Sequence, residues 1–282
     1  MPPRTLLAVF AHPDDEAFGS GGTLAHYAAR GVRVVLVCAT RGEVGEISDP
    51  ALATPDNLGS VREAELRNAA QALGLQSVHF LGYRDSGMAG TADNNNPQAF
   101  HNAPADDVIK QIVSLMREVQ PQVVITFDPQ GGYGHPDHIA IHKHTVAAFH
   151  ASDRADQYPE AGTPWQPERL FYSVIPRSTF RTMRDQLRSA GVDTQQWDQM
   201  DQNGMGWPDD EIDVTLDVAD TVAAKWAALN AHRTQFGPDN PFQQIGEAAA
   251  KQLMSREYFV QAAPEPQVDE QIDDLFAHIR HD

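Results

Sequence analysis

The sequence predicts an α/β fold, with a Rossmann-like, open and mostly parallel sheet that carries helices on both faces. Between residues 5 and 150, short runs rich in Val, Leu and Ile alternate with segments whose apolar residues recur at helical spacing. The apolar runs are nearly continuous, which is typical of parallel strands buried on both faces. Such alternation produces right-handed strand–helix–strand units, and these build an open, doubly wound sheet.

The first half of the chain is expected to hold four strand–helix pairs. In chain order they are the strand Leu6–Ala11, the helix Gly22–Arg30, the strand Val32–Ala39, the helix Val61–Leu73, the strand Val78–Leu81, the helix Asp106–Val119, the strand Val123–Phe127 and the helix Asp137–His150. Turns rich in glycine or proline separate them. Three loops, 12–21, 40–60 and 128–137, are expected beyond the carboxyl ends of the strands, where open α/β sheets bind ligands.

The second half is less regular. The expected elements are a strand near Leu170–Val174, a helix near Thr179–Ala190, a strand near Glu211–Val218 and a helix near Ala219–His232. Residues 193–210 are rich in polar and turn residues, which favours a surface excursion or lid. After Val260 the pattern favours a C-terminal amphipathic helix, which buries its apolar face or serves a dimer contact; its apolar residues are Ile272, Leu275, Phe276 and Ile279.

The length of 282 residues is expected to form a single domain. In this interpretation residues 1–150 are the Rossmann-like core with the chemically active residues. Residues 151–282 add strands, lid-like loops and C-terminal helices.

Composition argues against several classes of function. The formal net charge is −18 and Lys and Arg do not cluster, which argues against binding to nucleic acid. No apolar run approaches the roughly 18 residues of a membrane span. The N-terminus carries no signal-peptide pattern, so we expect a soluble, cytoplasmic protein without a membrane partner. A single cysteine, Cys38, excludes an internal disulfide and is expected to be a buried strand residue.

Two clusters of histidine and aspartate each follow an expected parallel strand. The first is "AHPDDE", residues 11–16, and the second is "GGYGHPDH", residues 131–138. The carboxyl ends of parallel strands share one edge of the sheet, so the two clusters are expected to meet. Two imidazoles and one carboxylate form the ligand set of catalytic zinc, with an open position for water.

Neighbouring residues in each cluster are expected to have different roles. Adjacent side chains on a turn point apart, so Asp15 can bind metal while Asp14 faces the substrate. Pro136 holds His135 extended, and Asp137 can cap a helix that His138 opens. One of these two histidines can be a ligand and the other an electrophile, with His142 as a reserve ligand one helical turn further on.

The sequence resembles the zinc-dependent deacetylases of the PIG-L/LmbE-like superfamily. The resemblance is carried by "AHPDDEAFGSGGTLA" and "HPDHIAIH", with further support from "LGYRDSGM" at 81–88 and "KWAALNAHRTQF" at 225–236. The last two segments are most similar to the actinobacterial branch, which includes the mycothiol-pathway N-acetylglucosaminyl-inositol deacetylase and the mycothiol S-conjugate amidase.

The resemblance implies a role for each matching residue. It implies that one Zn²⁺ per chain is bound by the ligands His12, Asp15 and His138, with Fe²⁺ or another divalent ion as alternatives. Asp14 would be the general base, and a protonated His135, oriented by Asp137, would stabilise the oxyanion. The implied contacts with a small amino-sugar substrate are Tyr133, Arg62, Asp85 and, less closely matched, Glu46. Glu16 is left to orient a neighbour or cap backbone donors.

The implied function is removal of the acetyl group from an N-acetylglucosamine glycoside, in low-molecular-weight thiol biosynthesis. The amidase that cleaves thiol–glucosamine S-conjugates is the main alternative. A nucleotide-binding protein is a remote alternative, because "GSGG" opens a helix after a strand, although the full G-x-G-x-x-G pattern and the acidic residue after the second strand are missing. A non-catalytic sugar-binding protein and a homo-oligomer also remain open.

Overall fold

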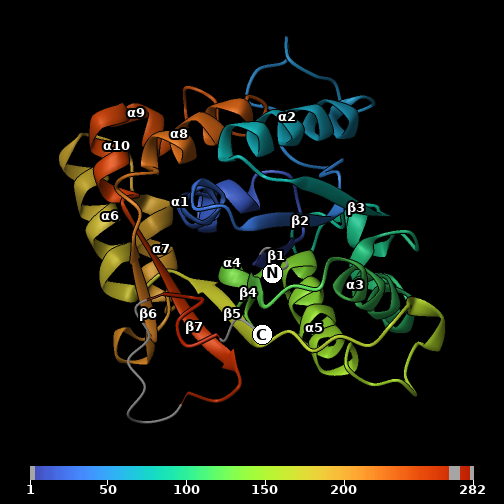
Figure 1. Cartoon of the computed structure of the whole chain (residues 1–282). Coiled ribbons are helices and arrows are strands. Elements are labelled where there is room, and N and C mark those ends of the chain that lie inside the picture. The colour runs from blue at the N-terminus through green and yellow to red at the C-terminus, as the bar shows by residue number, and fades with distance from the viewer. Residues whose placement is uncertain (1–3, 267–273, 280–282) are drawn as a thin grey trace.

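The structure, a computed structural model, describes residues 4–266 and 274–279, and the strands in this part of the chain form one seven-stranded sheet (Figure 1). The strand order is β3-β2-β1-β4-β5-β7-β6. The strands are β1 (Thr5–Phe10), β2 (Arg33–Thr40), β3 (Ser77–Tyr83), β4 (Val123–Phe127), β5 (Arg169–Val174), β6 (Val214–Asp217) and β7 (Arg256–Ala263). The first five are parallel, and β7 is antiparallel to both β5 and β6. The expected α/β class with a mostly parallel sheet is confirmed.

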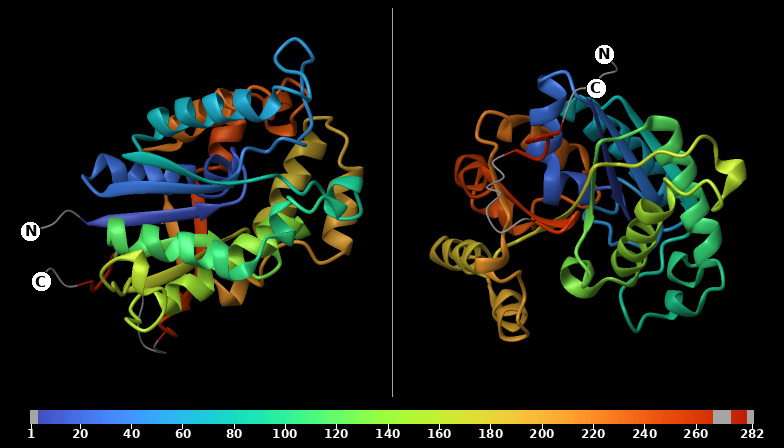
Figure 2. Two further views of the ribbon diagram at one scale, coloured as in Figure 1. Left: turned by 90° about the vertical axis from the view of Figure 1, so that its right-hand side faces the viewer. Right: turned by 60° about the horizontal axis from the view of Figure 1, so that its bottom comes forward.

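Helices cover both faces of the sheet (Figure 2). One face carries α1 (Asp15–Ala29), α2 (Leu58–Leu73) and α8 (Val222–Ala231), and the other carries α3 (Ala105–Val119) and α5 (Pro136–Ala151). The remaining α-helices of the described residues are α4 (Gly131–Gly134), α6 (Arg177–Ser189), α7 (Gln195–Gln202), α9 (Pro241–Gln244) and α10 (Glu247–Leu253). No helix in this part of the chain is long and apolar enough to cross a bilayer.

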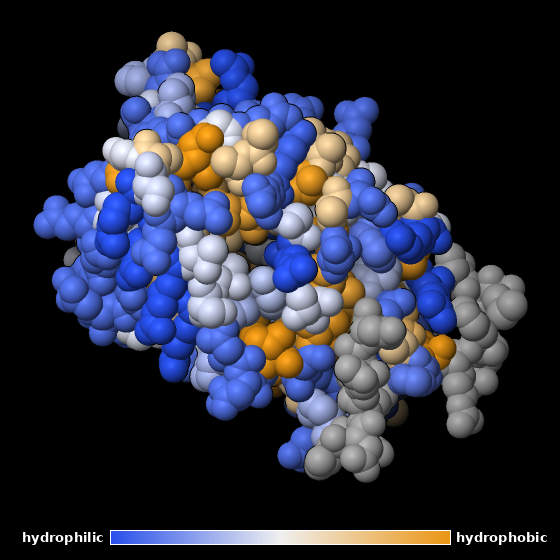
Figure 3. All heavy atoms as spheres, turned by 90° about the vertical axis from the view of Figure 1, so that its left-hand side faces the viewer, coloured by the Kyte–Doolittle hydropathy of each residue, from blue (hydrophilic) through white to orange (hydrophobic). Residues whose placement is uncertain are grey.

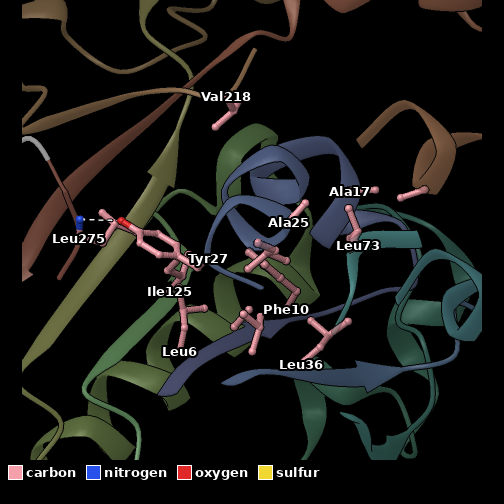
Figure 4. Close-up of a cluster of buried hydrophobic side chains, with 14 of the residues drawn as sticks. Leu6, Phe10, Ala17, Ala25, Tyr27, Leu36, Leu73, Ile125, Val218 and Leu275 are labelled. Atoms are coloured by element: carbon pink, nitrogen blue, oxygen red, sulfur yellow. Dashed lines mark hydrogen bonds between the residues drawn. The ribbon is translucent and has the colours of Figure 1, made fainter. Parts of the chain in front are cut away.

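The core has two halves because the side chains of β1 alternate between the faces of the sheet. Leu6 and Phe10 point towards α1 and α2, as Figure 4 shows, whereas Leu7 and Val9 pack against α3 and α5. All four side chains are at most 1% exposed. Cys38 of β2 is buried as a small strand residue, as expected.

The helix predicted at Gly22–Arg30 begins seven residues earlier than expected. The Asp14 carbonyl accepts hydrogen bonds from the backbone N–H groups of Ala17 and Phe18, so the helix starts directly after it. Asp15 and Glu16 fall in the first turn, where the helix dipole favours negative charge. Both residues lie in the segment 12–21 that the sequence predicts as a loop, so that prediction is wrong for residues 15–21.

Gly22 explains the glycine-rich start of this helix. A Cβ atom on Gly22 would lie 2.5 Å from Cγ2 of Val218, just beyond β6. The helix therefore passes the end of β6 at a distance that only glycine permits. All three glycines of "GSGG" lie against side chains of the protein itself. Their close packing therefore explains the motif, and the nucleotide-binding interpretation loses its basis.

The other boundaries in the first half lie within three residues of the prediction, and the strand Val123–Phe127 agrees at both ends. The expected helix Val61–Leu73 begins three residues earlier as α2, and the expected strand Val78–Leu81 is longer at both ends as β3. In the second half the expected strand near Glu211–Val218 is the shorter β6, since residues 209–211 form a 3-10 turn.

The segment predicted as a polar surface excursion or lid, 193–210, contains the helix α7. Trp197 of α7 stacks on Phe180 of α6, with 4.9 Å between ring centroids. Asp201 accepts hydrogen bonds from Arg181 and Arg184. The polar composition of the segment gives no sign of this helix, because α7 is held by these ion pairs and by the contacts of Trp197 with Phe180 and Phe242. The surrounding face is largely hydrophilic, with apolar side chains in small groups (Figure 3).

The prediction of a C-terminal amphipathic helix is wrong for the described residues. Residues 256–263 form β7 between β5 and β6, and residues 274–279 form turns. Leu275, Phe276 and Ile279 are nevertheless buried in the core as expected. Ile272 lies outside the described residues. The alternating burial of β7 shows the period of two that identifies a strand.

Candidate metal centre and active site

The two histidine–aspartate clusters meet at the carboxyl edge of the sheet. β1 and β4 are adjacent and parallel, and residues 11–16 follow the first while residues 131–138 follow the second. The topology therefore brings together groups that are more than a hundred residues apart in the sequence.

The three ligands implied by the resemblance face one another. His12 Nδ1 lies 3.1 Å from His138 Nε2 and 3.7 Å from Asp15 Oδ2, and His138 Nε2 lies 3.3 Å from Asp15 Oδ1. The three side chains are at most 9% exposed. His135 adds a third imidazole to His12 and His138, and their ring nitrogens lie within 4.8 Å of one another. Nitrogen and oxygen donors at this density could hold a transition-metal ion.

The electrostatics of the cluster also fit a cation. Burial lowers the pKa of His12, but the carboxylates of Asp137, Asp85 and Asp15 outweigh it and raise that pKa well above its ordinary value. Burial raises the pKa of Asp15, but His138 and His12 outweigh it and hold that pKa well below its usual range. The buried carboxylates are therefore stabilised by positive charge at His12 and His138, and a divalent ion bound between these imidazoles would supply that charge.

The Asp14 side chain, next in sequence to the implied ligand Asp15, is bound by Arg62. Its backbone has φ 117° and ψ −27°, a left-handed conformation that is unusual for a residue other than glycine. Its Oδ2 accepts a hydrogen bond from Nη2 of Arg62 at 3.2 Å. Burial raises the pKa of Asp14 to about 6, and the positive charge of Arg62 limits the rise. A carboxylate with a pKa near 6 is suited to accept and return a proton near neutral pH.

His135 is placed as a hydrogen-bond donor towards the site. Its Nδ1 accepts from the backbone N–H of Asp137 at 3.1 Å, so a neutral ring carries its proton on Nε2. Burial and the charges of His12 and His138 lower the pKa of His135 to about 4. The low pKa favours a neutral ring whose Nε2–H donates, whereas the resemblance implies a protonated His135.

Asp137 orients His135 through its backbone, whereas its carboxylate faces elsewhere. Oδ2 accepts from the backbone N–H of Ser86 at 2.9 Å and lies 3.2 Å from His12 Nε2, and Oδ1 accepts from the Ser86 hydroxyl. The contact of Ser86 with Asp137 could not be predicted from the sequence, because a serine in "RDSGM" has no distinguishing spacing. In that segment the resemblance identified only the neighbouring Asp85, which lies 3.4 Å from His12 Nε2.

The proposed substrate contacts fall into two groups. Asp85 and Tyr133 lie at the cluster: Asp85 is 3% exposed beside His12, and the half-exposed Tyr133 ring is 5.0 Å from that of His138. Arg62 is buried and donates to the carbonyls of Gly42 and Pro13 as well as to Asp14. Glu46 is exposed.

His142, the reserve ligand, and Glu16, which was left without a role in the metal site, both have partners elsewhere. The Nδ1 of His142 lies 2.8 Å from the carbonyl oxygen of Phe127, and the ring packs edge-on against Tyr172. Glu16 and His232 form a buried pair, with 2.7 Å between Oε1 and Nε2. The expectation that Glu16 binds a neighbour rather than the metal agrees with this contact.

Residues 7–149 match the model of the PIG-L family, described as GlcNAc-PI de-N-acetylase. The chain is 41% identical over 289 residues to a protein of Acidothermus cellulolyticus, covering 98% of this chain and 95% of the relative. The chain belongs to the PIG-L family. A Rhodococcus jostii relative is 38% identical over 296 residues and matched along the whole of both chains. Both relatives are named 1D-myo-inositol 2-acetamido-2-deoxy-alpha-D-glucopyranoside deacetylase.

Membership of the PIG-L family makes this chain a hydrolase that cleaves an amide. Among solved structures, the N,N'-diacetylchitobiose deacetylase of Pyrococcus horikoshii has a TM-score of 0.64 at 21% identity, covering 99% of this chain and 87% of that one. GalB, a 4-carboxy-2-hydroxymuconate hydratase of Pseudomonas putida, has a TM-score of 0.63 at 20% identity, covering 95% and 99%. These likenesses show the fold alone, and one such fold carries both a deacetylase and a hydratase.

Proposed function

We propose that this PIG-L protein removes the acetyl group from 1D-myo-inositol 2-acetamido-2-deoxy-α-D-glucopyranoside, with Zn²⁺ as its resident metal. The observation that carries the proposal is the similarity to relatives named for this reaction, which extends over at least 90% of both chains in the matches with Acidothermus and Rhodococcus. The site supports it, because its donors suit zinc and a carboxylate outside the donor set lies beside them. The reaction would belong to low-molecular-weight thiol biosynthesis in the cytoplasm.

His12, Asp15 and His138 would hold the metal, one ion per chain. When bound, zinc supplies Lewis acidity and makes water a nucleophile near neutral pH. A cluster of nitrogen donors with a single carboxylate favours zinc or Fe²⁺ over Mg²⁺ or Ca²⁺, which prefer sets made of oxygen atoms.

Asp14 performs the proton transfers. Its carboxylate accepts the proton of the attacking water and returns a proton to the leaving nitrogen of the glucosamine, which cannot depart as an anion. General acid–base catalysis of this kind is worth about 10²- to 10⁴-fold in rate. Arg62 keeps the carboxylate directed towards the substrate through its bond to Oδ2.

His135 stabilises the charge that develops on the acetyl oxygen. Its Nε2–H donates to that oxygen while Nδ1 remains bonded to the backbone of Asp137. An oxyanion donor of this kind contributes about 3 kcal/mol to the transition state. Because the neutral ring already carries the donor proton, it can act without first being protonated.

The sugar is proposed to lie between Asp85 and Tyr133. Asp85 offers carboxylate oxygens to hydroxyl groups, and Tyr133, at the mouth of the site, closes over the substrate. Arg62 and Glu46 complete the proposed sugar contacts. The three bonds that Arg62 already makes favour a role in holding Asp14.

The test asks which acyl group the protein removes from the nitrogen of glucosamine. Protein stripped with a chelator and reloaded with Zn²⁺ or Fe²⁺ is assayed for release of acetate from the inositol glycoside and for cleavage of a thiol–glucosamine S-conjugate. We expect metal-dependent release of acetate and slower cleavage of the conjugate. Preference for the conjugate would establish the amidase instead, and full activity without metal would refute the proposed mechanism.

A further inference from the structure

A buried chain of contacts runs from the second half of the protein to the backbone of Asp14. His232 Nε2 lies 2.7 Å from Oε1 of Glu16, and the two side chains are at most 1% exposed. The other oxygen of the same carboxylate, Oε2, accepts the backbone N–H of Asp14 at 3.0 Å. Both oxygens of Glu16 are therefore engaged, one with the histidine and one with the main chain of the proposed base.

Asp14 needs such support because its backbone is in an unfavourable conformation. A φ of 117° costs a residue other than glycine about 1–3 kcal/mol, and it persists only where surrounding contacts enforce it. Here the amide is held by Glu16, and the carboxylate is held by Arg62, which also bonds the carbonyl of Pro13. If the amide were released, the peptide could rotate and move the carboxylate.

His232 is itself fixed by the turn that follows α8, where Phe236 N–H donates to the His232 carbonyl at 2.7 Å. Thr234 in this turn donates from its backbone and its hydroxyl to Glu65 of α2, at 2.9 and 2.7 Å. The turn thus binds α1 through Glu16 and α2, the helix that carries Arg62, through Glu65. Figure 1 shows α8 beside α2.

We propose that Glu16 and His232 are positioning residues, which act as a pair to hold the backbone of Asp14 so that its carboxylate stays aimed at the reacting water. This inference rests on the proposed function, in which Asp14 is the base. Through His232 the second half of the chain takes part in catalysis, although His232 lies outside residues 7–149, which the family model matches.

The same helix provides a matched control. Glu257 of β7 is a buried carboxylate that accepts the backbone N–H groups of Gly22 and Thr23 in α1, and it pairs with Lys225 of α8 at 2.6 Å. Its contacts repeat those of Glu16, but they hold the middle of α1 instead of the residue before it. Weakening this second pair should cost stability without moving Asp14.

The test uses the zinc-loaded, full-length protein and the variants H232L, H232Q and E257Q. For H232L we expect kcat to fall by about 10- to 100-fold, as for a misplaced catalytic group, with KM and zinc content nearly unchanged. H232Q should recover most of kcat, because its amide nitrogen can occupy the place of Nε2. E257Q should unfold at lower urea concentration and keep its kcat. If H232L does not fold, H232N replaces it, since its amide is too short to reach Glu16.

A double-mutant cycle decides between positioning and general stability. If His232 acts through Asp14, adding H232L to D14N should not reduce the residual kcat further. A loss that multiplies in the double variant, or a full kcat in H232L, would overturn the inference. A full kcat in D14N would refute the assignment of the base in the proposed function. A low kcat in D14N together with a full kcat in H232L would refute only the role of the Glu16–His232 pair.

Discussion

Replacing Asp14 with Asn is expected to remove most of the turnover and, at neutral pH, to stabilise the metal-free protein. The loss of kcat should be about 10²- to 10⁴-fold, because Asn keeps the shape of the side chain but cannot accept the proton. Metal affinity should be unchanged, because the expected ligand atoms belong to His12, Asp15 and His138.

The gain in stability follows from the buried charge. The pKa of Asp14 rises from 3.8 to about 6, mainly through burial, which corresponds to about 3 kcal/mol of unfavourable free energy when the group is ionised. The Asn variant also leaves Arg62 without its charged partner, which offsets part of the gain. We therefore expect the free energy of unfolding to increase by about 1–3 kcal/mol, or the melting temperature by roughly 2–5 °C.

The dependence on pH gives the sign of the effect. The folded pKa is raised, so protonated Asp14 contributes stability that is fully present below about pH 4 and lost as the pH rises through 6. The difference in melting temperature between variant and parent, measured with chelator present, should grow over this window and be small below it. A variant that is less stable at pH 7.5 would refute the reasoning about charge, and a kcat within threefold of the parent, on the order of 0.6 kcal/mol, would refute the role of base.

Three further outcomes are expected. His12→Ala should lower zinc affinity by about 10²-fold or more, measured by competition with a chromophoric chelator, and unchanged affinity would mean that the ligand set is wrong. Zinc should raise the melting temperature relative to the chelated protein, because it offsets buried carboxylates; equal midpoints would contradict this. Gly22→Ala should cost about 1–3 kcal/mol in urea denaturation, because its Cβ would lie 2.5 Å from Val218, and an unchanged midpoint would show that the close approach is relaxed at no cost.

The parallel half of the fold could be predicted from the sequence because its signals are local. Each buried strand is a continuous apolar run, and the histidine–aspartate clusters directly follow two of them. Two clusters at the ends of adjacent parallel strands must share an edge, so the meeting of His12 with His138 required only the topology.

The remaining features depend on contacts between distant segments. β7 contains Glu257 and Gln261, buried polar residues that weaken the apolar signal of a strand, and their partners are far away in sequence. The pKa of His135 is lowered by burial and by the charges of His12 and His138, which no spacing in the sequence reveals. The positive φ of Asp14 also has no local signature, because a Pro-Asp-Asp run is compatible with an ordinary turn.

The position of β7 also bears on how the protein is made. Among the described residues β7 is the last strand in sequence, yet it lies between β5 and β6, so the strand that pairs with β6 there is complete only when residues 256–263 have left the ribosome. His232, which reaches back to Glu16, likewise emerges more than ninety residues after His138. A nascent chain can thus bring residues 11–16 and 131–138 together before His232 is available, so in the proposed mechanism the ligands of the metal would meet before the backbone amide of Asp14 gains its full support.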